Sequence, residues 1–196
     1  VPGLKNTLEL IDNLHPELEK LYVVNEAKTV SGREDREFLE SNLNLFKDKF
    51  EPIWLENMTD QEMQDTLAGL DEKSAVLLLS FFPDKQSAVF TIKEGAHFVD
   101  TASPRPVYSM WEYFLGEGIV GGMLTSGTYQ GQAAADMALR ILAGEDPESI
   151  EVVSESANHL MFDYEQLEEF GIDVDDLPES SVIVNEPVTV VNRYKN

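Results

Sequence analysis

The chain has 196 residues, with 14 Lys and Arg against 37 Asp and Glu, so its formal net charge is −23. This length is typical of one hydrophobic core, and the 42% hydrophobic fraction excludes a disordered acidic tail. Because so negative a surface repels phosphate groups, nucleic acid is excluded as a partner and anionic membrane surfaces are disfavoured. The chain has no cysteine, which excludes disulfides and thiolate metal sites.

The first half of the chain alternates between helical and strand patterns. Apolar residues at three- and four-residue steps predict a helix over 4–14, which Pro16 ends. Helical spacing returns over 33–50, after Thr59 and after Thr91, and each of these threonines has a Glu three residues on, as in a capping box. Short β-prone runs lie between these helices, at 21–24, 53–55, 75–82 and 106–110.

The apolar run 75–82 is typical of a central parallel strand that is covered on both faces. Residues 119–125 predict a further strand, and 130–143 a helix that ends before Gly144. Five of its residues are predicted to face inward: Ala134, Met137, Ala138, Ile141 and Leu142. Repeated strand and helix units predict an α/β fold, a three-layer Rossmann-like parallel sheet with helices on both faces.

The pattern changes after a β-prone piece at 150–153. Asp163 and Gln166 match the capping-box spacing before a short helix that ends at Gly171. An acidic loop follows over 173–179, and β-prone pieces lie at 182–184 and 188–191. No run approaches the roughly 18 apolar residues that would predict a membrane span.

Residues 116–121 match G-x-G-x-x-G, the dinucleotide-binding fingerprint. The third glycine of that motif opens a helix, whereas 121–125 continue as an extended run, and Glu117 would place a carboxylate beside the phosphates. We therefore interpret the glycines as a tight turn with close strand packing. The three histidines are far apart, and no metal-ligand or triad spacing is present, so we predict no catalytic residue, metal or cofactor.

Open α/β sheets bind ligands at the carboxyl ends of their strands, and three loops of this chain are predicted to lie there. The predicted ligand contacts are Asn25, Thr29 and Ser31 in the first loop, Ser80 and Asp84 in the second, and Ser109 and Glu112 in the third. Hydroxyls and backbone N–H groups at the start of a helix suit an anionic group. Aromatic and acidic groups after the central strand suit an apolar body and its ammonium.

Taken in order, segments along most of the chain resemble the ABC-transporter substrate-binding-like family of the type I periplasmic binding fold. The version they resemble is the extracytoplasmic sensor region of bacterial histidine kinases. The segments that carry the resemblance are 6–10, 14–16, 21–25, 31–32, 106–108, 115–122, 130–134, 141–145, 162–164, 167–172, 177–178 and 191–195.

The resemblance implies a non-enzymatic sensor domain that binds a small organic solute, such as an amino acid or another small acid, in a cleft between two lobes. It implies a place on the periplasmic or extracellular face of a bacterial inner membrane, within a membrane-anchored signalling protein. Residues 1–149 would form one Rossmann-like lobe that lacks most of its N-terminal partner. Residues 150–196 would return toward the missing lobe and a membrane span, and their exposed apolar surface predicts homodimers or rearranged packing.

Two alternatives stay open. A substrate-binding subunit of an ABC transporter would have the same cleft and a different downstream partner. A small α/β enzyme that uses a nucleotide or flavin could be built on the same alternation of strands and helices, but it would need a catalytic constellation that the sequence does not show.

Overall fold

The computed structural model describes residues 3–81, 91–151 and 158–187. Its helices are α1 (Leu4–Leu14), α2 (Val30–Leu43), α3 (Asp60–Ala68), α4 (Ile92–Ala102), α5 (Gly127–Leu142) and α6 (Tyr164–Phe170). Its strands are β1 (Lys20–Val24), β2 (Glu51–Leu55), β3 (Ser74–Leu78), β4 (Val107–Ser109), β5 (Gly121–Thr125), β6 (Asn158–Asp163) and β7 (Val182–Val184). Short 3-10 turns are η1 (Glu112–Phe114), η2 (Pro147–Ser149) and η3 (Val174–Asp176).

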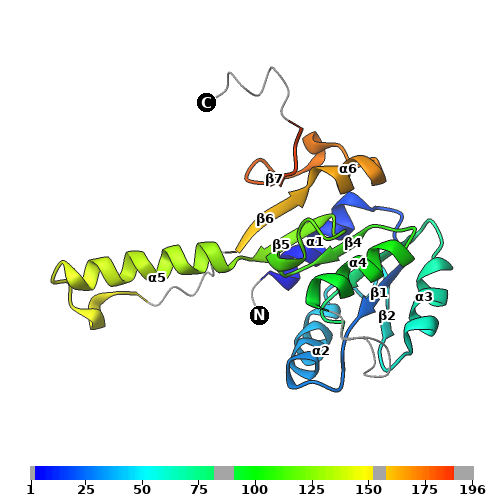
Figure 1. Cartoon of the computed structure of the whole chain (residues 1–196), viewed down its shortest axis with the longest axis horizontal. Helices are drawn as coiled ribbons and strands as arrows, with labels where there is room; N and C mark the ends of the chain where they lie inside the picture. Colours follow the sequence, from blue (N-terminus) through cyan, green and yellow to red (C-terminus); the bar gives the residue numbers. More distant parts are fainter. Residues whose placement is uncertain (1–2, 82–90, 152–157, 188–196) are drawn as a thin grey trace.

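The seven strands form one sheet in the order β2-β1-β3-β4-β5-β6-β7 (Figure 1). Strands β1 to β5 are parallel, which confirms the predicted α/β fold. Strand β6 is antiparallel to β5, which was not predicted, and β7 is parallel to β6. Thr125 at the end of β5 pairs with Asn158 at the start of β6. The chain therefore re-enters the sheet at the edge where β5 ends, and β6 runs in the opposite direction to β5.

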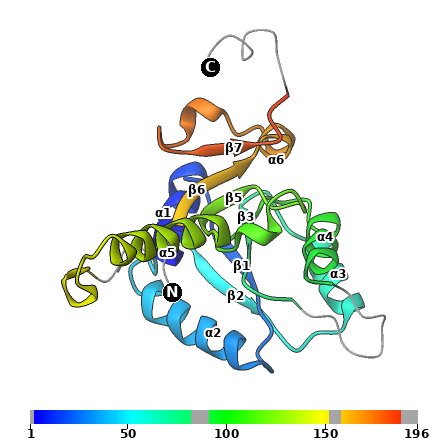
Figure 2. The ribbon, with the colours of Figure 1, turned by 60° about the vertical axis from the view of Figure 1, so that its left-hand side comes forward.

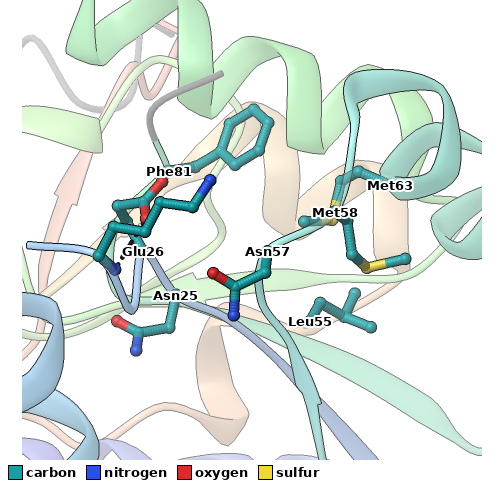
Figure 3. A pocket seen from close by; sticks show the side chains of 8 residues that line it. Asn25, Glu26, Leu55, Asn57, Met58, Met63 and Phe81 are labelled. Carbon is teal, nitrogen blue, oxygen red and sulfur yellow. Dashed lines mark hydrogen bonds between the residues drawn. The ribbon is translucent and has the colours of Figure 1, made fainter. Parts of the chain in front are cut away.

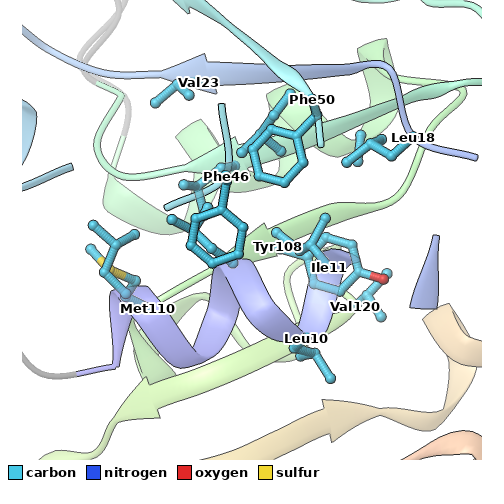
Figure 4. Packing of buried hydrophobic residues seen from close by; sticks show 14 of the residues in the cluster. Leu10, Ile11, Leu18, Val23, Phe46, Phe50, Tyr108, Met110 and Val120 are labelled. Carbon is cyan, nitrogen blue, oxygen red and sulfur yellow. The ribbon is translucent and has the colours of Figure 1, made fainter. Parts of the chain in front are cut away.

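Apolar residues cover both faces of the sheet, because alternate residues of a strand point to opposite sides. Leu77 of β3 joins a core with residues of α1 and α2, such as Leu8 and Leu39. Figure 4 shows part of this core, with Ile11 of α1 and Tyr108 of β4. The residues on either side of Leu77, Val76 and Leu78, join a second core with α3 and α4. All five residues of β3 are buried, so the predicted central strand is confirmed.

Local signals set most helix starts. The capping boxes predicted at Thr59 and Thr91 are both present. At α6 the predicted box is wrong, because the Asp163 carboxylate accepts from the backbone N–H of Glu165 instead. Helix α2 ends at Leu43, seven residues earlier than predicted, although Phe46 and Phe50 are buried as their spacing indicated.

Helix α5 projects from the body of the molecule as an arm (Figures 1 and 2). None of its residues is buried among the described parts of the chain, so the prediction of five inward-facing side chains is wrong. The helix itself was predicted correctly, but periodic spacing shows only that a helix has an apolar face. Ile141 and Leu142 of this face are 44% and 82% exposed.

Two predicted β-prone pieces, at 150–153 and 188–191, lie wholly or partly outside the described residues. Within the described ranges, no helix is both long and apolar enough to cross a bilayer.

Candidate ligand-binding site

The candidate site lies at the carboxyl edge of the five parallel strands. The chain runs from β1 outward to β2 and then back past β1 to β3, so the direction of strand addition reverses between β1 and β3. Ligands bind in the crevice at such a reversal in open α/β sheets. Asn25 follows β1 and Ser80 follows β3, so two of the predicted ligand contacts flank this point.

Asn25 and Ser80 are in direct contact. The Ser80 hydroxyl donates to Asn25 Oδ1 at 3.2 Å and accepts from the Glu26 backbone N–H at 3.1 Å. The Asn25 amide donates to the Gly32 carbonyl at 3.0 Å and to Glu56 Oε1 at 2.7 Å. Because Asn25 is 4% exposed and both of its donor hydrogens are used, it joins the loops after β1, β2 and β3. Its contact with a ligand stays a prediction.

The loop between β1 and α2 is fixed by its own side chains. Thr29 caps α2, since its hydroxyl accepts from the Gly32 N–H at 3.0 Å and donates to the Glu26 carbonyl at 3.0 Å. The Ser31 hydroxyl is exposed and lies 3.4 Å from that of Thr29. The hydroxyls of Thr29 and Ser31 thus lie side by side, and their contact with a ligand stays a prediction.

The third predicted loop follows β4. Ser109 is fully buried, and its hydroxyl donates to the Leu78 carbonyl at 2.8 Å and accepts from the Trp111 N–H at 3.3 Å. The Ser109 hydroxyl therefore links β4 to β3 beneath the carboxyl edge of the sheet. Glu112 opens η1 and is half-buried. The remaining predicted contact, Asp84, lies outside the described residues.

Two aromatic side chains of this loop form a stacked pair. The rings of Trp111 and Tyr113 are stacked, with centroids 5.8 Å apart and planes at 15°. Phe114 meets Tyr113 edge-on at 4.5 Å and is buried, whereas Tyr113 is 45% exposed. Burial and the nearby negative charge of Asp35 raise the pKa of Tyr113 to about 12. The pair offers a partly open aromatic surface to a ligand.

Sequence reasoning missed two acidic groups of the site. Glu56 directly follows β2, and its side chain is 8% exposed; it pairs with Arg36, whose guanidinium lies 4.5 Å from the Trp54 ring centroid. Its place after a strand was the signal that could have revealed it. Asp35 is 8% exposed and lies on α2 between Gly32 and Leu39, on the buried stripe. An acidic residue four positions before Leu39, on the same face of the helix, was the signal that could have revealed Asp35.

A small pocket opens between the loops after β1 and β2 (Figure 3). Its lining combines an apolar floor with a polar rim: Asn25, Glu26, Lys28, Leu55, Asn57, Met58, Met63 and Phe81. Its volume is about 20 Å³, which is room for about one water molecule. Asn57 has a positive φ of 55° here, a conformation that asparagine tolerates better than most residues.

The glycines at 116–121 form a turn and not a nucleotide site. Strand β5 begins at Gly121, where the fingerprint would need a helix. Gly118 has a φ of 104°, and a side chain there would overlap the side chain of Asp100. The predicted tight turn with close packing is confirmed. Among the described residues, no group of three His, Cys, Asp or Glu side chains could hold a metal ion.

Asp100, packed under this turn, should make stability depend on pH. Burial, followed by the charge of Glu169, raises its pKa from 3.8 to about 6. Since the folded state binds the proton more tightly, the stability that protonation contributes is lost as pH rises from about 4 to about 6. We expect Asp100→Asn to stabilise the protein by about 1–2 kcal/mol at about pH 7.5 and little at about pH 4.

Urea unfolding at both pH values measures this effect, and Asp136→Asn on the exposed face of α5 is the control. A loss of stability in Asp100→Asn at about pH 7.5 would contradict the assignment.

The fold that these elements build is a type I periplasmic-binding-protein-like fold, and solved structures match it. A ligand-free, open substrate-binding protein with adhesive properties from Clostridium difficile is 16% identical, with a TM-score of 0.69 over 93% of this chain and 59% of that one. The ABC domain in complex with L-Trp from Streptococcus pneumoniae is 16% identical, with a TM-score of 0.62 over 92% and 60%. A conserved domain protein from Vibrio cholerae is 18% identical, with a TM-score of 0.60 over 92% and 60%.

The family model described as "ABC transporter substrate binding protein" matches residues 3–184. The chain therefore belongs to the ABC transporter substrate-binding protein family, whose members bind solutes, and the predicted family is confirmed. The chain spans about 60% of the length of the structures that it matches. No curated protein matches the sequence.

Proposed function

We propose that this chain supplies one lobe of a solute-binding protein, and that a small organic solute, such as an amino acid, binds at the carboxyl edge between this lobe and a second one. The observation that supports the proposal is the arrangement of the loops at the carboxyl edge of the sheet. Three loops meet there around the contact between Asn25 and Ser80, beside the open face of Trp111 and Tyr113. The L-Trp complex of the Streptococcus relative supports an amino acid as the kind of solute.

The chain's path supports a second lobe. The start of α1, the end of β5 and the start of β6 lie together at this edge, since Thr125 pairs with Asn158 and the Cβ position of Gly3 is 3.2 Å from Asn158 Nδ2. Each of these points is a place where the chain can cross to another lobe. The matched structures have about 40% of their length beyond the part this chain covers.

We propose a domain division that follows the same points. The predicted division placed α5 in a lobe of residues 1–149, followed by a segment over 150–196. We propose instead that 3–81, 91–125 and 158–187 form one body, because β6 pairs with β5. Helix α5, whose apolar face is exposed, then packs on the second lobe.

Two downstream roles share this site. The sequence resemblance supports the extracytoplasmic sensor domain of a membrane-anchored signalling protein, histidine kinase type, on the outer side of a bacterial inner membrane. The family description supports the substrate-binding subunit of an ABC transporter at least as well. Deletion of the native gene distinguishes them: loss of solute uptake identifies the transporter subunit, and loss of a solute-dependent kinase response identifies the sensor. The predicted homodimer has no support beyond the exposed apolar face of α5.

A thermal-shift screen of the complete native protein tests the proposed function. The probes are the common L-amino acids, small carboxylic acids, nucleotides and flavins. We expect at least one small solute to raise the melting temperature by about 5–10 °C at a concentration near 100 times its Kd. Stabilisation by a nucleotide or flavin alone would favour the small α/β enzyme considered as an alternative.

A further inference from the structure

The amino edge of the sheet, opposite the candidate solute site, carries a strongly acidic segment. Residues 164–187, which include α6, η3 and β7, contain eight Asp and Glu and no Lys or Arg. Other acids of this edge are paired, Glu19 with Lys73 and Asp71 with Lys20. By contrast, no Asp or Glu of α6 or η3 forms an ion pair with a described residue. The described chain therefore leaves a local excess of negative charge here.

A groove runs along this segment, and we call it the α6 groove. It consists of two cavities of about 410 and about 300 Å³, which both include Gly171 and Ile172 at the end of α6. The larger cavity lies between the ends of α1 and α6, and the smaller one between α6 and η3. Leu14 and Phe170 line the larger cavity, and Val174, which is 40% exposed, lines the smaller one. Each cavity thus has apolar walls.

Carboxylates flank these apolar walls. Glu168 and Asp173 line the smaller cavity and Asp176 the larger one, and among the described residues no Lys or Arg lines either. The C-terminal ends of α1 and α6 also meet the larger cavity, and the C-terminal end of a helix carries partial negative charge. The groove therefore attracts positive charge and apolar surface together.

These two features determine the kind of partner that fits. Negative charge repels nucleic acids and anionic membranes. In the part of the chain that the structure describes, no three acids are grouped so that they could hold a metal ion. A protein segment in which Lys or Arg alternates with apolar residues offers both kinds of side chain along its length. In extended form it repeats each kind about every 7 Å, so it can place apolar side chains in both cavities.

We propose that the α6 groove docks a basic segment of a partner protein. Apolar side chains of that segment enter the two cavities, and its Lys or Arg side chains pair with Glu168, Asp173 and Asp176. This inference goes beyond the proposed function and does not depend on it. The groove lies where β6 ends, whereas α5 leaves from the carboxyl edge, where β6 begins (Figure 1). A second lobe joined at the carboxyl edge would leave the groove open.

Fluorescence anisotropy with the complete native protein tests the docking surface. The probe is a labelled, capped ten-residue peptide in which lysine alternates with leucine; two comparison peptides have serine for leucine or glutamate for lysine. In about 150 mM salt, which screens distant charges, we expect the lysine–leucine peptide to bind with a Kd of about 10–100 μM. Each comparison peptide should bind at least about 10-fold more weakly.

Two sets of variants locate the peptide on the protein. The triple variant Glu168→Gln, Asp173→Asn and Asp176→Asn should weaken binding about 10-fold or more. The control removes three exposed charges elsewhere, by Glu34→Gln, Glu37→Gln and Asp48→Asn, and should bind as the wild type.

A second substitution tests the apolar wall without a change of charge. Val174→Ser should weaken binding about 3- to 10-fold, whereas Val30→Ser, at an exposed position of α2, should not. Because all of these positions lie at the surface, the melting temperatures of the variants should stay within a few degrees of the wild type.

Several results would overturn the proposal: no binding of the lysine–leucine peptide, equal binding of the lysine–serine peptide, or equal effects of the two triple variants. The second of these results would show non-specific charge attraction only. Displacement of the peptide by an equal concentration of spermidine would identify a site for small cations instead. None of these results touches the proposed function, because solutes found in the thermal-shift screen should stabilise the groove variants as they do the wild type.

Discussion

Gly32→Ala is expected to lower the free energy of unfolding by about 2–3 kcal/mol, and the melting temperature by about 5–10 °C. A Cβ at this position would overlap the Glu26 carbonyl oxygen and lie 3.0 Å from Thr29 Oγ1. The backbone there cannot move easily, because the Glu26 carbonyl also accepts the Thr29 hydroxyl, and the Gly32 carbonyl accepts from Asn25. The loop between β1 and α2 must therefore shift.

Gly131→Ala is the matched control for this substitution. Gly131 lies in the interior of α5, and its Cβ position has no neighbour within 4 Å. Since alanine favours a helix over glycine by about 1 kcal/mol, this variant should be neutral or more stable. Chemical unfolding of both variants measures the difference in their free energies of unfolding. Equal effects of the two substitutions would show that a side chain at position 32 does not clash with the Glu26 carbonyl.

Asn25→Ala is expected to cost about 2–4 kcal/mol, which lowers the melting temperature by about 5–15 °C. The substitution removes three hydrogen bonds: the Gly32 carbonyl loses the Asn25 amide as a donor, and the Ser80 hydroxyl loses its acceptor and keeps only the Glu26 N–H. It also removes a donor from the carboxylate of Glu56, which is buried beside it. Buried polar groups left unpaired are costly.

Asn44→Ala, at the exposed end of α2, is the control and should change stability by no more than about 0.5 kcal/mol. Urea unfolding compares the two. A small effect of Asn25→Ala, within the range of this control, would mean that the three loops are not joined through Asn25.

The sequence predicted most of the body because its signals are local. Each of the capping boxes at Thr59 and Thr91 satisfies backbone N–H groups within a single helical turn, so its neighbours along the chain determine it. The apolar run of β3 needs only cover on both faces, whichever helices supply it. Parallel pairing of β1 to β5 then follows from the alternation of strands and helices.

Local signals could not predict what α5 and β6 do. The apolar face of α5 has the spacing of any packed helix, and only the tertiary structure shows that the described body does not cover it. The direction of β6 depends on where the chain re-enters the sheet, which is set by the pairing of Thr125 with Asn158. The spacing of apolar residues along the chain reveals neither the exposure of α5 nor the direction of β6.

Part of the candidate site followed from position alone. Residues after strands β1, β3 and β4 were predicted to gather, and Asn25 and Ser80 do touch. Asp35 was missed because an acid in the first turns of a helix is usually solvated and favoured by the helix dipole. Its burial depends on how α2 packs in the tertiary structure, which the spacing of residues within the helix does not reveal.

Amide hydrogen exchange of the complete native protein, with and without the L-amino acid that stabilises it most, tests the central claim most directly. We expect ligand-dependent protection at the carboxyl edge, in residues 25–32 and 109–118, and no change in the loops at the opposite edge, 71–73 and 103–106. Protection confined to that opposite edge, or absent from both carboxyl-edge segments, would contradict it.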